Sequence, residues 1–347
     1  MVFVRDSLAG KIPITVITGF LGSGKTTLIS QLVRHPDMRR VALVINEVGE
    51  IGIDHDLVTM SSENISLLAN GCICCSVRTD MQETLRDLFA KRRVGEIFDF
   101  DRVIIETTGL ADPAPVLQTL VSDSLLEAQF RLDGVATLVD AVNAYQLLKE
   151  IPEAVKQVAI ADQLFLTKTD LATPEMIHQI TTELQALNPQ APIEQVLNGN
   201  LEPQKLMNIG LGSSKVNSSS QSFLSGLDTF NEGEADKHQE KYLGEFRRHS
   251  GINTLSLRFD EPFTWKAFSS ALELLTGLRG NDLLRVKGIV NVEGDPVVIQ
   301  GVQHIFHPQV KLDRWPSQDH TSRIVFITRN MSKEMITNLF KAVGAIA

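Results

Sequence analysis

Residues 12–32 read IPITVITGFLGSGKTTLISQL, and this stretch decides the fold. A short apolar run leads into a glycine-rich loop, and a helical pattern follows the loop. From Gly19 to Thr26 the loop matches G-x-x-x-x-G-K-[ST], in the strand–loop–helix context that this phosphate-binding motif requires. The sequence therefore predicts a nucleoside triphosphate site after the first strand; the alternative is a glycine-rich turn that binds nothing.

The spacing of this loop follows from what phosphates need. Glycines let backbone N–H groups converge on phosphate oxygens, and the N-terminus of the following helix adds a partial positive charge. Lys25 is expected to reach the β- and γ-phosphates, and the Thr26 hydroxyl is expected to ligate Mg²⁺. The predicted cradle consists of Gly19, Gly22, Ser23, Gly24, Lys25, Thr26 and Thr27.

Apolar, β-rich runs recur along the first part of the chain. They lie at 12–18, 41–46, 65–70, 102–107, 135–141 and 163–168, and helical patterns such as 26–35 and 80–93 lie between them. Runs that are apolar throughout are typical of parallel strands covered on both faces. Residues 1–207 are therefore predicted to form an α/β domain of the P-loop NTPase type, with a doubly wound, mostly parallel sheet.

The composition changes from about residue 208 to residue 250, where serine, glycine and charged residues dominate and a flexible linker is predicted. Beyond it, residues 252–260 alternate like a half-buried strand and residues 263–278 read as a helix. Three further strand-like runs and a closing helix follow. Residues 251–347 are predicted to form a smaller α+β domain with an antiparallel order of strands.

Composition narrows the class of protein. The 347 residues carry a formal net charge of −9, which argues against binding to the phosphate backbone of nucleic acid. No window approaches the roughly 18 apolar residues that span a bilayer, and the first residues resemble neither a signal peptide nor an anchor. Three cysteines without a secretory signal favour a reducing compartment, so a cytoplasmic location without a membrane partner is expected.

The run VIIETTG at 103–109 supplies two further parts of a nucleotide site. Glu106 ends a buried strand, where a carboxylate can hold Mg²⁺ through water, and the backbone N–H of Gly109 can sense the γ-phosphate. Glu106 is therefore predicted to be catalytic, together with Lys25. The alternative is a buried structural acid.

The tetrapeptide Thr167-Lys168-Thr169-Asp170 matches the Asn-Lys-x-Asp guanine reader except at its first position. Asp170 can accept hydrogen bonds from the guanine N1 and N2 groups, which adenine lacks, and the Lys168 stem can cover the base. Thr167 shortens the usual tie between this loop and its surroundings. GTP is therefore the favoured nucleotide, and a strand-end lysine followed by a capping aspartate is the alternative.

All three cysteines, Cys72, Cys74 and Cys75, lie within GCICCSVRTD (71–80). An odd number of thiols so close together cannot form a disulfide framework. Thiolates prefer soft ions such as Zn²⁺ or Cu(I), and three protein ligands leave a fourth position open for exchange. Because Cys74 and Cys75 are adjacent, Cys72 with one of them and an acid is a second possible ligand set; buried free thiols are the alternative.

Taken together, the chain resembles the CobW-type metallochaperone GTPases. The segments that carry the resemblance are GFLGSGKTT, NEVGEIGID, NGCICCSVRTD, ETTGLADP, TKTD, VKGIV and VQHIFHP, and they occur in family order over nearly the whole chain. The resemblance implies a GTPase whose cysteine site binds zinc, or cobalt, in a way coupled to the nucleotide. It also implies that Asp54 aligns Mg²⁺ or the attacking water, and that Glu47 and Glu50 complete a transient metal site; each can instead be a solvated loop acid.

The second domain contains His304, His307 and His320, which could relay metal or simply pack. The working hypothesis is that GTP and Mg²⁺ order residues 46–54 and 106–115, and that hydrolysis lets the metal pass to a client metalloprotein. Turnover is expected to be slow, and a second copy of the chain or the client could supply a missing catalytic group. Alternatives from other classes are a small-molecule kinase, a metal-sensing and nucleotide-sensing regulator, and a thiol redox protein using Cys72 and Cys75.

Overall fold

The computed structural model describes residues 8–46, 58–61, 65–68, 73–76, 81–110, 112–211, 214–216 and 251–343. The chain divides into two compact units. One consists of Gly10–Thr181 with Ala191–Gly210, and the other of Met1–Ala9, Thr182–Gln190 and Leu211–Ala347. Within the described residues, no helix has both the length and the apolar character needed to cross a membrane.

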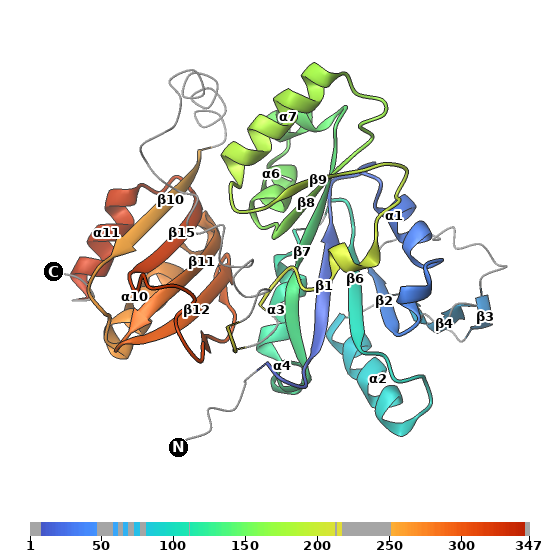
Figure 1. Cartoon of the computed structure of the whole chain (residues 1–347), viewed down its shortest axis with the longest axis horizontal. Coiled ribbons are helices and arrows are strands. Elements are labelled where there is room, and N and C mark those ends of the chain that lie inside the picture. The colour runs from blue at the N-terminus through green and yellow to red at the C-terminus, as the bar shows by residue number, and fades with distance from the viewer. Residues whose placement is uncertain are drawn as a thin grey trace. The chain divides into compact units, whose positions relative to one another are not determined.

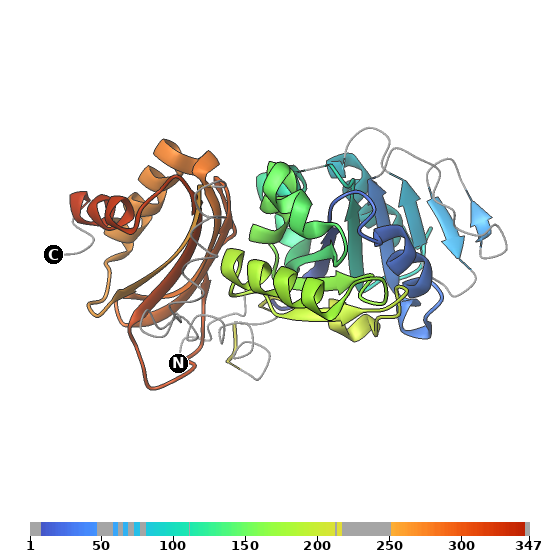
Figure 2. The same cartoon turned by 90° about the horizontal axis from the view of Figure 1, so that it is seen from above.

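The first unit is built on one sheet of nine strands with helices on both faces (Figures 1 and 2). Its strand order is β3(Val58–Ser61), β4(Ile65–Leu68), β5(Ile73–Ser76), β2(Val41–Asn46), β6(Arg102–Thr107), β1(Ile12–Thr18), β7(Phe130–Asp140), β8(Gln163–Thr167) and β9(Ile193–Val196). The pairs from β5 through to β9 are all parallel. The predicted doubly wound, mostly parallel sheet is confirmed.

The helices of this unit connect the strands. They are α1(Lys25–Leu32), α2(Met81–Val94), α3(Ala114–Ser122), α4(Ser124–Gln129), α5(Ala144–Glu150), α6(Pro152–Ala159) and the part of α7(Pro174–Leu187) up to Thr181, with short 3₁₀ turns η1(Pro36–Met38) and η3(Pro203–Leu206). Helix α1 packs through Leu28 and Ile29 onto a core that includes Leu138 of β7. The neighbouring Thr137 bonds instead to α6, so α1 and α6 cover opposite faces of the sheet.

Two expectations about this unit need correction. The run at 65–70 is not one of the parallel strands: β4 pairs antiparallel with both β3 and β5 and, with β3, extends one edge of the sheet. The helical pattern at 26–35 stops earlier, because α1 ends at Leu32 and Pro36 opens a 3₁₀ turn. A residue before proline is driven out of the α conformation, which explains the early end.

The second unit contains a six-stranded antiparallel sheet, with helices α10 and α11 on one face (Figure 2). Its elements are β10(Ile252–Phe259), α10(Trp265–Arg279), η4(Gly280–Asp282), β11(Leu283–Val292), β12(Asp295–Val302), β13(Ile305–Phe306), β14(Val310–Lys311), β15(Ser322–Arg329) and α11(Lys333–Ala342). Phe268 and Phe340 from the two helices join Phe326 of β15 in one buried core. The predicted small α+β domain is confirmed.

The first residues of the predicted linker are packed. The backbone N–H of Asn208 donates to Asp133, while Leu211 and Val216 are buried in a cluster with Val325 of the second unit. Leu211 and Val216 are isolated apolar residues among serines and glycines, so the composition of this segment gives no signal of their burial. Residues 217–250 lie outside the described part of the chain, so the linker boundaries stay predictions.

Candidate nucleotide site and the cysteine strand

The phosphate loop leaves β1 at Thr18 and enters α1 at Lys25, and its backbone strongly favours glycine at three positions. Gly19, Gly22 and Gly24 have φ angles of 143°, 75° and 93°, a region that L side chains rarely occupy. A Cβ atom on Gly19 would lie 2.5 Å from the carbonyl oxygen of Leu138 and 2.7 Å from Ser23 Oγ. The loop therefore owes its shape to residue type and to the packing of β7 beneath it.

The start of α1 is open to an anion. Gly24 is the N-cap residue and gives no side-chain hydrogen bond to the helix, and no acidic residue lies in the first turn. Thr26 and Thr27 are exposed there. Backbone N–H groups at a helix start, without a side-chain cap, are the usual partners of phosphate oxygens.

Lys25 is buried and its ammonium lies against the loop backbone. Its Nζ donates to the carbonyl oxygens of Gly19, at 2.8 Å, and Phe20, at 3.2 Å. The positive charge is thereby held within the loop that was predicted to bind phosphates.

The end of β6 lies beside the phosphate loop. Glu106 is buried and pairs in register with Ile17 of β1, and the Thr107 hydroxyl donates to Thr18 Oγ1 at 2.8 Å. Gly109 comes still closer to the loop: a Cβ atom there would lie 2.8 Å from the backbone nitrogen of Leu21. The structure thus brings together the predicted phosphate loop, the predicted carboxylate and the predicted γ-phosphate sensor.

Thr167 ties the predicted guanine loop to the phosphate loop. Its hydroxyl donates to the carbonyl oxygen of Ser23 at 2.8 Å and to that of Val139 at 3.2 Å, and the side chain is buried. A threonine in place of the expected asparagine therefore keeps a direct connection between the two loops. Asp170, three residues later, is exposed, as a residue that reads a base must be.

Asp140 was not predicted as a site residue, yet it holds Lys168. Lys168 Nζ donates to Asp140 Oδ2 at 2.8 Å, and the amides of Val142 and Asn143 donate to the other oxygen. Burial raises the pKa of Asp140, but the hydrogen bonds from Lys168, Asn143 and Val142 outweigh it and lower the pKa below its usual value. A carboxylate at the end of a buried strand, the signal that identified Glu106, was also present here.

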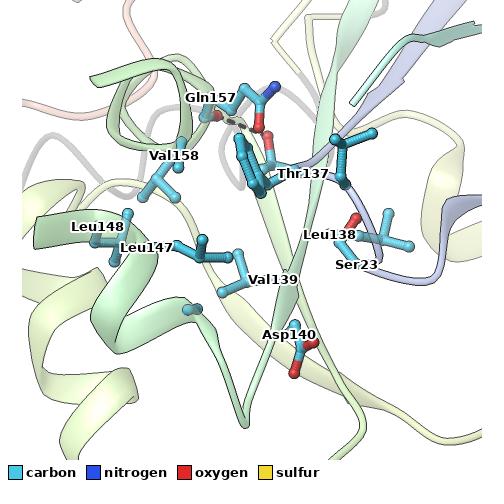
Figure 3. A pocket seen from close by; sticks show the side chains of 13 residues that line it. Ser23, Thr137, Leu138, Val139, Asp140, Leu147, Leu148, Gln157 and Val158 are labelled. Carbon is cyan, nitrogen blue, oxygen red and sulfur yellow. Dashed lines mark hydrogen bonds between the residues drawn. The ribbon is translucent and has the colours of Figure 1, made fainter. Parts of the chain in front are cut away.

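A small cavity lies behind the phosphate loop, between β7 and helices α5 and α6 (Figure 3). Its walls include Leu21, Leu138, Val139, Leu148 and Val158, with Asp140 at one end and Gln157 at the other. At about 20 Å³ it is comparable to the volume of one buried water and too small for a nucleotide. The open edge of the phosphate loop therefore stays the candidate nucleotide site, and the cavity lies behind it.

Cys74 and Cys75 lie on β5, and the structure describes their backbone. Cys75 pairs with Val44 of β2, which pairs in turn with Ile105 of β6. Both cysteines therefore lie on the strand that borders β2 in the sheet. Cys72, Glu47, Glu50 and Asp54 lie outside the described residues.

His304, His307 and His320 of the second unit have different surroundings. His304 is exposed, His307 is buried, and His320 stacks on Trp315 with ring centroids 4.8 Å apart. In the parts of the chain that the structure describes, no group of three or more His, Cys, Asp or Glu side chains has metal-binding geometry.

Comparison with known proteins agrees with this geometry. Residues 13–195 match the CobW/HypB/UreG nucleotide-binding domain, and residues 252–344 match the cobalamin synthesis protein CobW C-terminal domain. The zinc chaperone YjiA of Escherichia coli is 33% identical over 95% of this chain and 98% of its own length. The zinc-regulated GTPase metalloprotein activator 1 of Saccharomyces cerevisiae is 27% identical over 95% of this chain and 83% of its own length.

Solved structures include a similar chain. The crystal structure of Zn(II)-bound YjiA GTPase from Escherichia coli superposes with a TM-score of 0.75 at 30% identity. The superposition covers 96% of this chain and 99% of the YjiA chain. The similarity therefore extends through both units.

Proposed function

The chain belongs to the CobW/HypB/UreG family, and we propose that it is a GTP-hydrolysing metallochaperone. In this proposal Cys72, Cys74 and Cys75 bind zinc and the nucleotide state governs its delivery to a client metalloprotein. The names of the relatives, zinc chaperone and zinc-regulated GTPase, support both the GTP hydrolysis and the zinc delivery in this proposal. The geometry supports nucleotide binding, because a glycine loop, an open helix start and a buried lysine lie together at one edge of the sheet.

Hydrolysis requires groups that position phosphates. Lys25 supplies charge to the β- and γ-phosphates, the α1 amides hold phosphate oxygens, and the Gly109 amide contacts the terminal phosphate. Thr167, Lys168 and Asp170 select guanine. Asp54 is proposed to align the attacking water.

The residues present also fit Mg²⁺. Mg²⁺ prefers oxygen ligands and usually keeps several waters. The exposed Thr26 hydroxyl and the buried Glu106 carboxylate are oxygen donors on adjoining elements, so these two residues would hold the ion directly or through water. When bound, Mg²⁺ neutralises the charge that develops on the phosphate oxygens.

One observation carries the link between nucleotide and metal: the strand with two of the cysteines is hydrogen-bonded into the sheet that holds the nucleotide loops. Ser76, Ile45, Glu106 and Ile17 form one continuous register row across β5, β2, β6 and β1. Strands β5 and β6 are two strand spacings apart, roughly 10 Å. Strand β2 lies between β5 and β6. The segment 46–54, which starts at the last residue of β2 and contains Glu47 and Glu50, is proposed to transmit the nucleotide state to the cysteines.

A second connection joins the segment after the cysteines to the helix after Gly109. Gln82 and Arg86 of α2 both donate to Asp123 Oδ2 at 2.6 Å, and Asp123 lies between α3 and α4. Helix α2 begins just after the cysteine segment, and α3 begins just after the phosphate-sensing loop. Movement of either loop therefore has a direct mechanical path to the other.

The test measures zinc affinity of the purified protein with GDP and with a non-hydrolysable GTP analogue. We expect at least a tenfold difference between the two states, and loss of high-affinity zinc binding in a variant with Cys72, Cys74 and Cys75 all replaced by serine. Because two adjacent cysteines are strained as ligands of one ion, the single variants Cys74→Ser and Cys75→Ser should weaken zinc binding unequally. Co²⁺ titration in place of zinc reports thiolate ligation through its visible absorption.

Two variants serve as controls. His304→Ala removes an exposed histidine and should leave zinc affinity unchanged. Lys25→Ala should abolish the nucleotide effect while leaving zinc binding itself intact. Equal zinc affinity with both nucleotides would refute the coupling, and unchanged affinity in the triple-serine variant would move the metal site elsewhere.

A further inference from the structure

The loop after β6 is held at two points by neighbouring residues of one distant helix. Gln157 Nε2 donates to the carbonyl oxygen of Gly109 at 3.2 Å, and Lys156 Nζ lies 3.4 Å from Asp112 Oδ2. Both Lys156 and Gln157 belong to α6, more than forty residues further along the chain. We refer to these two residues as the α6 clamp.

The clamp is fixed from behind by the sheet. Gln157 is 1% exposed and lies on the apolar side of α6, beside buried Val158, and Thr137 Oγ1 of β7 donates to its backbone oxygen at 2.8 Å (Figure 3). Burying an amide side chain costs free energy unless it is hydrogen-bonded. An apolar residue at position 157 would pack without this cost in free energy. The hydrogen bond to Gly109 offers a reason for a glutamine at this buried position.

The other end of the loop is also tied to the clamp. Asp112 Oδ1 accepts from the backbone N–H of Ala114, at the start of α3, while Asp112 Oδ2 faces Lys156. The Lys156 and Asp112 side chains are 22% and 29% exposed, so this second point is weaker than the buried one. The clamp thus restrains both Gly109 and the beginning of α3.

Gly109 is where restraint matters most. It lies against the phosphate loop, with space for no side chain between it and Leu21. Glycine has the widest choice of backbone angles, so its own residue type does not fix which way its peptide groups point. A hydrogen bond to the Gly109 carbonyl fixes the plane of the Gly109–Leu110 peptide, because peptide groups are planar. The Gly109 N–H belongs to the preceding peptide, so the bond restrains it by holding the Gly109 Cα atom in place.

We propose that Gln157 is a positioning residue for GTP hydrolysis. It holds the Gly109–Leu110 peptide against the phosphate loop, and Lys156 holds Asp112 as a second point. The proposal rests on the GTP hydrolysis proposed above and is independent of zinc delivery. Because the clamp orders the loop before GTP binds, less conformational entropy is lost when the γ-phosphate binds. Without the clamp, the loop must be ordered on GTP binding, which weakens GTP affinity and slows hydrolysis.

The clamp should affect the binding of GTP and of GDP differently. GDP is held by the phosphate loop and by the base-reading residues, whereas the clamp bonds described above go to Gly109 and Asp112. GTP also needs the loop that carries Gly109. Loss of the clamp should therefore weaken γ-phosphate-dependent steps and leave GDP binding nearly unchanged.

The test uses the full-length Gln157→Met variant, which keeps side-chain length and apolar volume but removes the donor. We expect GDP affinity within about twofold of the parent protein. The affinity for a non-hydrolysable GTP analogue and kcat should each fall about tenfold, which corresponds to about 1.4 kcal/mol. Gln146→Met is the matched control: it makes the same change at an exposed position of α5, where the side chain pairs with Glu150, and should alter none of these values.

Three results would overturn the proposal. The first is an unchanged ratio of analogue to GDP affinity together with unchanged kcat in folded Gln157→Met protein. The second is a parallel loss of both affinities with a lowered melting temperature, because this is the behaviour of a residue that only supports the fold. If Gln157→Met does not fold, the variant Lys156→Met, at a partly exposed position, is measured instead. An unchanged ratio of analogue to GDP affinity with unchanged kcat refutes the clamp, and a loss in this ratio and in kcat, smaller than tenfold, supports it. A parent protein without GTPase activity would refute the proposed function itself, before any variant is compared.

Discussion

Thr167 illustrates how a single side chain can preserve a connection while departing from the usual motif. An asparagine was expected there, and the shorter threonine still reaches the phosphate loop because β8 runs directly beside β7 and ends next to Ser23. Asp140 acts in the same region by holding Lys168. At this scale, hydrogen bonds of about 2.8 Å between neighbouring loops determine where the base-reading residues lie.

Thr167→Val removes the hydroxyl and keeps the shape. Two buried carbonyl oxygens, those of Ser23 and Val139, lose a donor, so we expect a loss of about 1–2 kcal/mol in the free energy of unfolding. Because the phosphate loop holds GDP and GTP alike, both affinities should fall by a similar factor. Urea denaturation and calorimetric titration measure these effects; Thr119→Val, which removes an exposed helical hydroxyl, should have little effect on either.

Asp170→Asn tests the base reader. In the proposed role the Asp170 carboxylate accepts two hydrogen bonds from guanine, whereas an amide accepts only one. We therefore expect the preference for GTP over ATP to fall by about ten- to a hundredfold, equivalent to about 1–3 kcal/mol. Competition of ATP and GTP against a fluorescent GDP measures the preference. A variant that discriminates as well as the parent protein would clear Asp170 of this role.

At the scale of elements, the ion pair between α2 and the α3–α4 junction stands out. Asp123 caps α4 through the amides of Leu125 and Leu126 and accepts from Gln82 and Arg86 of α2. Burial raises its pKa, but the hydrogen bonds from Gln82, Leu126, Arg86 and Leu125 together lower the pKa to about 2, from a usual value of 3.8. One carboxylate therefore joins three helices.

This pKa shift predicts a pH dependence. A carboxylate with a lowered pKa in the folded state contributes stability that is fully present above pH 4 and is lost as the pH falls towards 2. Asp123→Asn should therefore cost about 1–3 kcal/mol at pH 6, and the difference from the parent protein should shrink between pH 4 and pH 2. Urea denaturation at several pH values measures this.

Asp87→Asn is the control for that experiment. It removes an exposed α2 carboxylate that pairs with Lys91 and should cost at most about 0.5 kcal/mol. A difference between the Asp123→Asn and parent proteins that stays constant down to pH 2 would contradict the assignment of this stability to the ionised Asp123.

For the whole molecule, the question is whether the two units unfold separately. Each has its own sheet and its own hydrophobic core. Ligand binding stabilises only the part that binds, by about 2.7 kcal/mol at a concentration of one hundred times Kd. The proposed nucleotide site lies entirely within the first unit.

Scanning calorimetry with and without GDP should therefore show one transition that shifts upward and one that does not. In Lys25→Ala protein neither transition should move. A single transition that shifts as a whole would mean that the units unfold together, and the boundaries predicted at residues 207 and 251 would then not separate independent folding units.

Much of the nucleotide site was predictable because its signals are local. Gly19, Gly24 and Lys25 stand at fixed spacings along one loop, and Glu106 ends an apolar strand, so neither assignment depends on distant parts of the chain. Gln157 and Asp123 gave no such signal. Gln157 is a single polar residue on α6 and Asp123 is the residue between α3 and α4, and their partners lie about forty residues away or more in sequence.

The strand around the cysteines was missed for a different reason. ICCS at 73–76 is too short to show a period, and its place in the sheet depends on pairing with β2 and β4. The same pairing made β4 antiparallel, although its sequence looks like that of a buried parallel strand. Strand direction follows from the connection between strands, which the composition of one strand does not encode.

By itself, the sequence determined the phosphate loop, the alternation of strands and helices that makes the first unit α/β, and the two-part organisation, because residue type and spacing dictate backbone conformation and burial over short distances. Only the tertiary structure decided that Thr167 bonds to Ser23, that Asp140 holds Lys168, that Asp123 joins α2 to α4, and that α6 restrains Gly109. These contacts join segments far apart along the chain, and their existence depends on how the sheet and its helices pack in space.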